Sequence, residues 1–104
     1  MKKKGALMKN YNLTEKLDFD GNPTITIKDE TIEVKADAMN VLEVLASAEK
    51  SDAEFVKTGF ELLFSEEDKE KIKSFKFKTK DFVKVIRTAF SLAMGNNPEE
   101  KGEM

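Results

Sequence analysis

The residue types that most often carry catalysis are missing from this sequence of 104 residues, which contains no His, no Cys and no Trp. Disulfides, thiol nucleophiles, Cys/His zinc sites and imidazole general bases are therefore excluded. Serines are present, but no GxSxG, SxxK or phosphate-binding GxxxxGK[ST] pattern accompanies them. The sequence favours a protein that is not an enzyme, and we expect neither a metal nor a cofactor.

Carboxylates are concentrated at Glu66, Glu67, Asp68 and Glu70. Two carboxylates form an acid/base pair or a metal site only when they converge on one point. Consecutive helical residues do not converge, and acidic residues in a first turn stabilise the helix dipole. We interpret this cluster as structural.

The most basic stretch covers residues 69–87, with eight Lys or Arg against two acidic residues. Lysines interleaved with Phe75 and Phe77 are what a single-strand nucleic-acid binder would use. The simpler interpretation is that both rings face the core while the lysines keep the segment solvated, and Arg, the usual base-reading residue, occurs only once here. The candidate basic patch consists of Lys73, Lys76, Lys78, Lys80, Lys84 and Arg87.

Phenylalanine is the most distinctive apolar feature of the chain, which contains eight of them. Most of these rings must form the core, but a band wider than one helix face would leave some for a partner. The candidate partner-binding residues are Phe60, Phe64, Phe75, Phe77 and Phe82. Gly59 lies inside the same helical pattern, which predicts the close approach of another backbone.

Two strands are predicted over residues 24–28 and 31–35, where β-branched apolar residues alternate with polar ones. The connection at Asp29-Glu30 lacks the glycine of a two-residue turn, so we expect a slightly longer loop. A third strand is indicated over residues 13–19. The residues facing the core would be Ile25, Ile27, Ile32 and Val34.

Helical periodicity follows from residue 37 to about residue 93, with breaks that predict four helices. The expected N-caps and first residues are Asp37, Ser51, Ser65, and Thr79 or Lys80. Gly95 lies where the left-handed residue after a helix belongs. We expect an extended connector at Phe75 and Phe77. The first helix is expected to bury a stripe formed by Met39, Leu42, Leu45 and Ala46, widened by Val41 and Val44.

These elements indicate an α+β fold: a small N-terminal antiparallel β-hairpin or three-stranded meander followed by about four helices in one domain. The domain should span residues 13–95, between a mobile basic tail (1–12) and a mobile acidic tail (96–104). The net charge of −2, with 37% charged residues, indicates a surface of mixed sign. No apolar run approaches the roughly 20 residues that cross a bilayer. We therefore expect a cytoplasmic protein with no membrane partner.

Three segments together resemble the tail assembly chaperones of long-tailed bacteriophages and of prophages of Gram-positive bacteria. They are residues 20–27 (DGNPTITI), residues 62–72 (LLFSEEDKEKI), and Lys80-Asp81-Phe82 at the start of the last helix. The resemblance covers about residues 17–95, and its most specific part is the Leu-Phe-Ser-Glu-x-Asp-x-x-Lys-Ile stretch. The family has no consensus active site, so no catalytic residue is transferred.

The resemblance implies a non-enzymatic chaperone that coats the tape measure protein, recruits tail tube subunits such as the major tail protein, self-associates, and is absent from the mature virion. Two other functions stay open. One is a small nucleic-acid-binding or regulatory protein that uses Lys73 to Arg87, although nucleic acid is not the ligand we expect. The other is a structural virion or connector component, which purified particles would contain. Nucleic-acid binding would depend steeply on salt, whereas chaperone binding would depend on apolar side chains.

Overall fold

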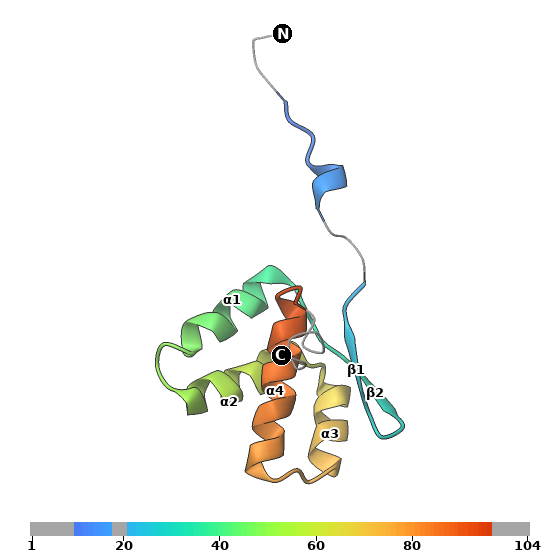
Figure 1. Ribbon diagram of the computed structural model, residues 1–104, viewed down its shortest axis with the longest axis vertical. Coiled ribbons are helices and arrows are strands. Elements are labelled where there is room, and N and C mark those ends of the chain that lie inside the picture. The colour runs from blue at the N-terminus through green and yellow to red at the C-terminus, as the bar shows by residue number, and fades with distance from the viewer. Residues whose placement is uncertain (1–9, 18–20, 97–104) are drawn as a thin grey trace, which may run out of the picture.

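Two strands and four helices follow one another in the computed structural model, which describes residues 10–17 and 21–96 (Figure 1). The elements are a short 3-10 helix η1 (Thr14–Lys16), β1 (Thr24–Ile27), β2 (Glu30–Glu33), α1 (Ala38–Ser47), α2 (Asp52–Leu63), α3 (Glu66–Ser74) and α4 (Thr79–Ala93). This order confirms the predicted α+β fold with an N-terminal hairpin and four helices. Most of the two expected tails, residues 1–9 and 97–104, lies outside the described residues.

The hairpin is antiparallel and pairs Ile25 with Ile32, which places both isoleucines on one face. Ile32 is fully buried and Ile25 packs against the core beside it. The connection is a two-residue turn, shorter than expected, because Lys28 takes the positive φ of 55° that primed turns require at their first position. A lysine therefore does here what a glycine usually does.

The prediction of a third strand over residues 13–19 is wrong for residues 13–17, which the structure describes. The N–H of Lys16 donates to the carbonyl of Leu13 at 2.8 Å, which closes the 3-10 turn η1. The side-chain oxygen of Asn12 accepts a hydrogen bond from the N–H of Thr14 at 2.9 Å and so starts the turn. Residues 18–20 lie outside the described residues.

Serine caps begin α2 and α3 as predicted. Ser51 Oγ accepts from the N–H of Glu54 at 3.0 Å, and Ser65 Oγ accepts from the N–H of Asp68 at 3.1 Å. Asp37 is the N-cap of α1, but its carboxylate accepts from the side chain of Asn40 rather than from the backbone. These caps fix where the helices start and hence how their faces meet.

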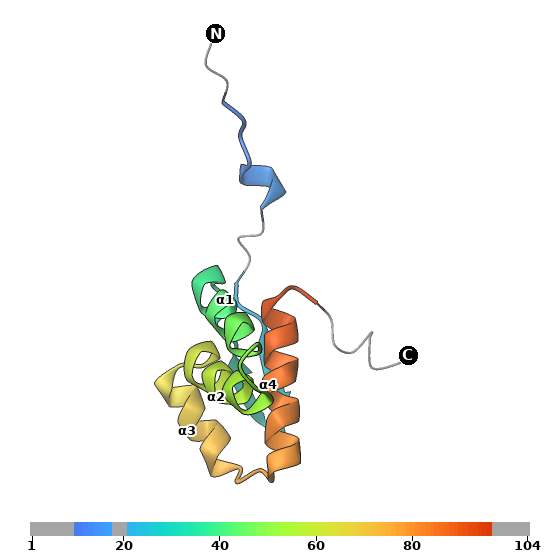
Figure 2. The ribbon, with the colours of Figure 1, turned by 90° about the vertical axis from the view of Figure 1, so that its left-hand side faces the viewer.

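The core lies where the hairpin and all four helices meet. Figure 2 shows α1, α2 and α3 along one side of α4. The segment after β2 is tied to the end of α2, because the N–H of Lys35 donates to the carbonyl of Leu63 at 2.8 Å. The largest fully buried side chains are Ile32, Val34, Val44, Leu63, Phe64, Ile72 and Ile86.

The inward face of α1 differs from the expected one. Val41, Val44 and Ser47 are buried, and the hydroxyl of Ser47 donates to the carbonyl of Val44. Since this serine satisfies its own hydrogen bond, the narrow β-branched face can pack inward at little cost. The stripe expected to be buried is instead exposed: Met39 is 72%, Leu42 56% and Leu45 44% exposed, and Ala46 is exposed as well.

The connector between α3 and α4 is a tight turn rather than the extended segment that we expected. Phe75 keeps helical dihedral angles, and Lys76 takes a left-handed φ of 53°. The N–H groups of Phe75 and Lys76 donate to the carbonyls of Ile72 and Lys73, at 3.2 and 3.1 Å. A left-handed residue directly after a helix ends the helix by satisfying its last carbonyls.

Candidate functional site

The five candidate partner-binding phenylalanines do not form one surface. Phe64 is only 1% exposed and lies in the core, whereas the other four are partly buried against it. Phe60 on α2 lies 5.4 Å from the ring of Phe82 on α4 and 6.3 Å from that of Phe64. These three rings join α2 to α4, which leaves the pair at the α3–α4 turn as the candidate contact.

Phe75 and Phe77 stack on each other at this turn, with ring centroids 5.3 Å apart and planes inclined by 24°. Both rings are half-buried, and the lysine between them is exposed. Because Lys76 holds the chain in a left-handed conformation, the two rings are presented together on a fixed turn. In Figure 1 and Figure 2 this turn lies at the end of the domain away from α1.

The six residues of the candidate basic patch are all exposed, but two of them have partners. Lys73 pairs with Glu70 at 3.6 Å, and Arg87 lies 4.0 Å from Asp52 and stacks over the ring of Phe55. Within residues 10–17 and 21–96, the remaining four have no ion pair. These four lysines surround the α3–α4 turn and the first turns of α4: Lys76, Lys78, Lys80 and Lys84.

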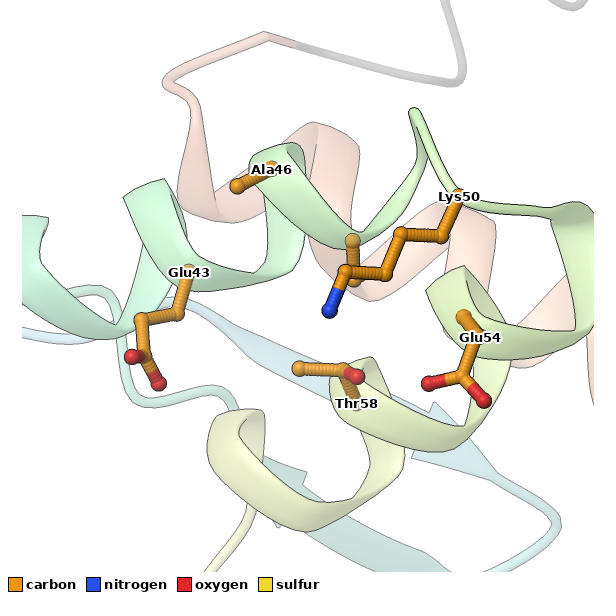
Figure 3. Close-up of a pocket in the computed structure, with 6 residues that line it drawn as sticks. Glu43, Ala46, Lys50, Glu54 and Thr58 are labelled. Atoms are coloured by element: carbon orange, nitrogen blue, oxygen red, sulfur yellow. The ribbon is translucent and has the colours of Figure 1, made fainter.

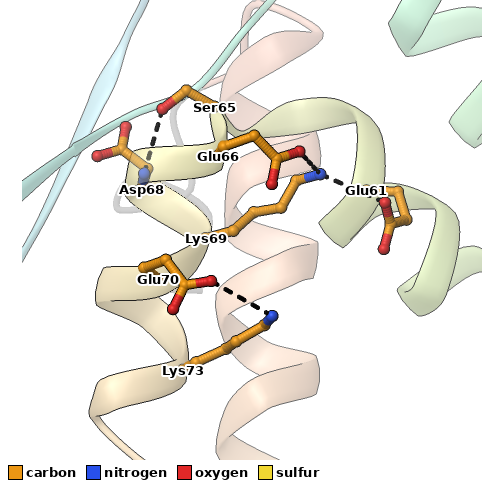
Figure 4. A network of polar contacts seen from close by, with 7 residues as sticks. All are labelled: Glu61, Ser65, Glu66, Asp68, Lys69, Glu70 and Lys73. Carbon is orange, nitrogen blue, oxygen red and sulfur yellow. Dashed lines mark hydrogen bonds and ion pairs between the residues drawn. The ribbon is translucent and has the colours of Figure 1, made fainter.

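The acidic cluster at the start of α3 is engaged in structural contacts (Figure 4). Asp68 is buried, and one of its oxygens accepts from the N–H of Glu33 at 3.0 Å, which ties α3 to β2. Its other oxygen lies 3.6 Å from Lys71. Glu70 pairs with Lys73. Among the described residues no three potential metal ligands come together.

Lys69 is a buried cation held between two carboxylates, as Figure 4 shows. Its Nζ lies 3.1 Å from Glu66 and 3.3 Å from Glu61. The hydrogen bond to Glu66 raises the pKa of Lys69 above its ordinary value of 10.5, with support from Glu61, although burial acts in the opposite direction. The pair with Glu61 connects α3 to α2.

Replacing Lys69 by Met is therefore expected to change the pH dependence of stability more than stability at neutral pH, where the loss should stay within about 1 kcal/mol. A raised folded-state pKa gives a contribution that is complete below pH 10.5 and disappears as the pH rises through the folded-state value. Urea unfolding at increasing pH should show this alkaline loss in the wild type and not in Lys69→Met. Lys73→Met, at an exposed ion pair, is the control and should keep the alkaline loss.

An open cleft of about 250 Å³ lies between α1 and α2. In Figure 3 the ammonium group of Lys50 points into it between Glu43 and Glu54, with Thr58 below. The two carboxylates lie on opposite sides of a lysine, so they form no acid/base pair. We assign no chemistry to this cleft. Its lining residues are Glu43, Ala46, Ser47, Lys50, Glu54 and Thr58.

One exposed apolar face is formed by the stripe that periodicity had placed in the core. It is the outer face of α1, formed by Met39, Leu42 and Leu45, which we call the α1 face. The signal that could have found it is that α1 is apolar on more sides than a single core contact can cover. Among the described helices, α1 included, none is both long and apolar enough to cross a bilayer.

Comparison of the chain with protein-family models, with curated protein sequences and with solved structures finds no match. No residue role is therefore transferred to this chain from a relative.

Proposed function

We propose that this protein is a non-enzymatic phage tail assembly chaperone that binds a long helical client, the tape measure protein, and promotes assembly of the tail tube around it. The observation that carries the proposal is the stacked pair of Phe75 and Phe77 on the α3–α4 turn. Aromatic side chains surrounded by exposed polar groups are typical of protein-binding surfaces. The resemblance of residues 17–95 to this chaperone family supplies the identity of the client.

The turn suits a helical client for a physical reason. Two partly exposed rings side by side can receive the apolar stripe of an amphipathic helix, whose anchors recur three and four residues apart. The exposed side chains of Lys76 and Lys78 keep the surface around the two rings hydrated in the free protein. A fixed turn also costs less to dock than a flexible segment, because its conformational entropy is already lost.

The test is co-expression with a tape-measure-type protein, followed by light scattering of the purified species. The wild-type chain is expected to keep the client soluble in a stoichiometric complex, and Phe77→Ala is expected to lower the yield of that complex at least tenfold. Phe90→Ala is the matched control, since Phe90 is another half-buried ring, whose centroid lies 5.1 Å from that of Phe55 in an edge-on arrangement. It lies farther along α4, so its loss should leave binding intact.

A second candidate function is binding of single-stranded nucleic acid, favoured by the four lysines around the same two rings. In that case affinity would fall steeply with salt, and Lys76→Glu with Lys78→Glu would abolish it. A client that stays insoluble, together with such a salt-dependent complex, would overturn the chaperone proposal. Recovery of the chain in purified particles would instead point to a structural component of the virion.

A further inference from the structure

Within residues 10–17 and 21–96, two exposed apolar surfaces lie away from the half-buried pair at the α3–α4 turn. One is the α1 face, on a helix whose opposite side is buried. The other is a segment that we call the arm, residues 10–17, in which Tyr11 is 70%, Leu13 47% and Leu17 53% exposed. No residue of η1 within the arm is buried. Apolar groups gathered on two surfaces of one small chain suggest that they cover each other.

We propose that the protein self-associates by exchanging arms, so that the arm of one copy lies on the α1 face of a second copy and the reverse contact forms by symmetry. In Figure 1 and Figure 2 η1 lies beyond the domain rather than against its own α1. The arm is thus placed to reach a neighbour. A reciprocal exchange gives a closed, two-fold symmetric dimer in which neither surface remains exposed.

The dimensions of the two surfaces agree. Leu13 and Leu17 flank a 3-10 turn and are about 8 Å apart at its rise of about 2 Å per residue. Met39 and Leu45 are about 9 Å apart along α1 at about 1.5 Å per residue. The two leucines of the arm can therefore lie against Met39 and Leu45, one on each side of Leu42.

Charge favours the arm over a second α1 face as the occupant. The arm is neutral, with Lys16 balanced by Glu15, whereas residues 37–49, which include α1, contain three acidic residues and neither Lys nor Arg. A second α1 face would bring like charges together, so face-to-face packing of two α1 helices is disfavoured.

The experiment is to measure the mass of the full chain by sedimentation equilibrium and light scattering, from micromolar to millimolar concentration and without any client. The wild type should approach twice the 11.8 kDa of one chain. Leu42→Glu, and separately Leu13→Glu with Leu17→Glu, should each reduce it to the mass of one chain. Thr79→Glu, an added charge at an exposed position on the far end of α4, should leave the dimer unchanged.

Mixing the two defective variants distinguishes arm exchange from other dimers. The Leu42→Glu chain keeps an intact arm, and the arm variant keeps an intact α1 face, so the mixture should form a heterodimer with one good contact. Circular dichroism of each variant checks that it remains folded. A wild type that stays monomeric overturns the proposal, as would an arm folded back on its own α1. A dimer that survives the arm variants but not Leu42→Glu also overturns it, in favour of direct α1–α1 packing.

Discussion

Replacing Phe64 by Ala is expected to lower the free energy of unfolding by about 3–5 kcal/mol, the usual loss when a buried phenylalanine is truncated. Phe64 is 1% exposed at the end of α2 and contacts the ring of Phe60. Its neighbours come from rigid helices, so the cavity cannot close fully. Because small domains are stable by only about 5–15 kcal/mol, this one change removes a large part of the total.

Urea unfolding followed by far-ultraviolet circular dichroism measures this loss. Phe77→Ala is the comparison, and it should cost less because its ring is half-buried at the α3–α4 turn. The two variants thus separate a core role from a contact role within one residue type. A Phe64→Ala protein that unfolds at the wild-type urea concentration but fails to bind its client would contradict the core position and restore Phe64 as a contact residue.

Local sequence signals predicted the hairpin and the four helices because the physics of these elements is local. The helices α2 and α3 each begin at a serine whose hydroxyl oxygen accepts a hydrogen bond from the backbone N–H three residues later, and this contact does not depend on the rest of the chain. Alternation of isoleucine with polar residues predicted which face of the hairpin turns inward, but not the register, because the turn falls at Lys28-Asp29 rather than at Asp29-Glu30. Lys28 and Lys76 show where such reasoning fails, since nothing about a lysine indicates a left-handed backbone.

The orientation of α1 could not be predicted in the same way. Its apolar residues surround most of the helix, so periodicity alone leaves two faces equally suited to the core. The choice of Val41 and Val44 over Leu42 and Leu45 depends on what α2 and α4 offer as neighbours, which is tertiary information. For the same reason the α1 face was hidden in the sequence, and the five candidate phenylalanines could not be sorted into core and contact.

Close approach at Gly59 was predictable from its position in a helix, but the neighbour is the side chain of Ile86 rather than the backbone that we expected. A Cβ atom added there would lie 2.7 Å from Ile86 Cγ2 and 3.7 Å from Val44 Cγ1. Ile86 is fully buried on α4, and its branched side chain has one favoured rotamer in a helix. The methyl group of Ile86 therefore cannot turn away, and α2 and α4 would have to move apart.

We accordingly expect Gly59→Ala to destabilise the domain by about 1–2 kcal/mol, because overpacking costs about 1–3 kcal/mol and the better helix propensity of alanine returns up to about 1 kcal/mol. Gly21→Ala is the control, since nothing lies within 4 Å of its added Cβ. Combining Gly59→Ala with Ile86→Leu, which removes the clashing methyl group, should cost less than the sum of the two single changes. If Gly59→Ala alone raised stability, helix propensity would outweigh packing, and α2 and α4 would have to lie farther apart than their contact at Ile86 indicates.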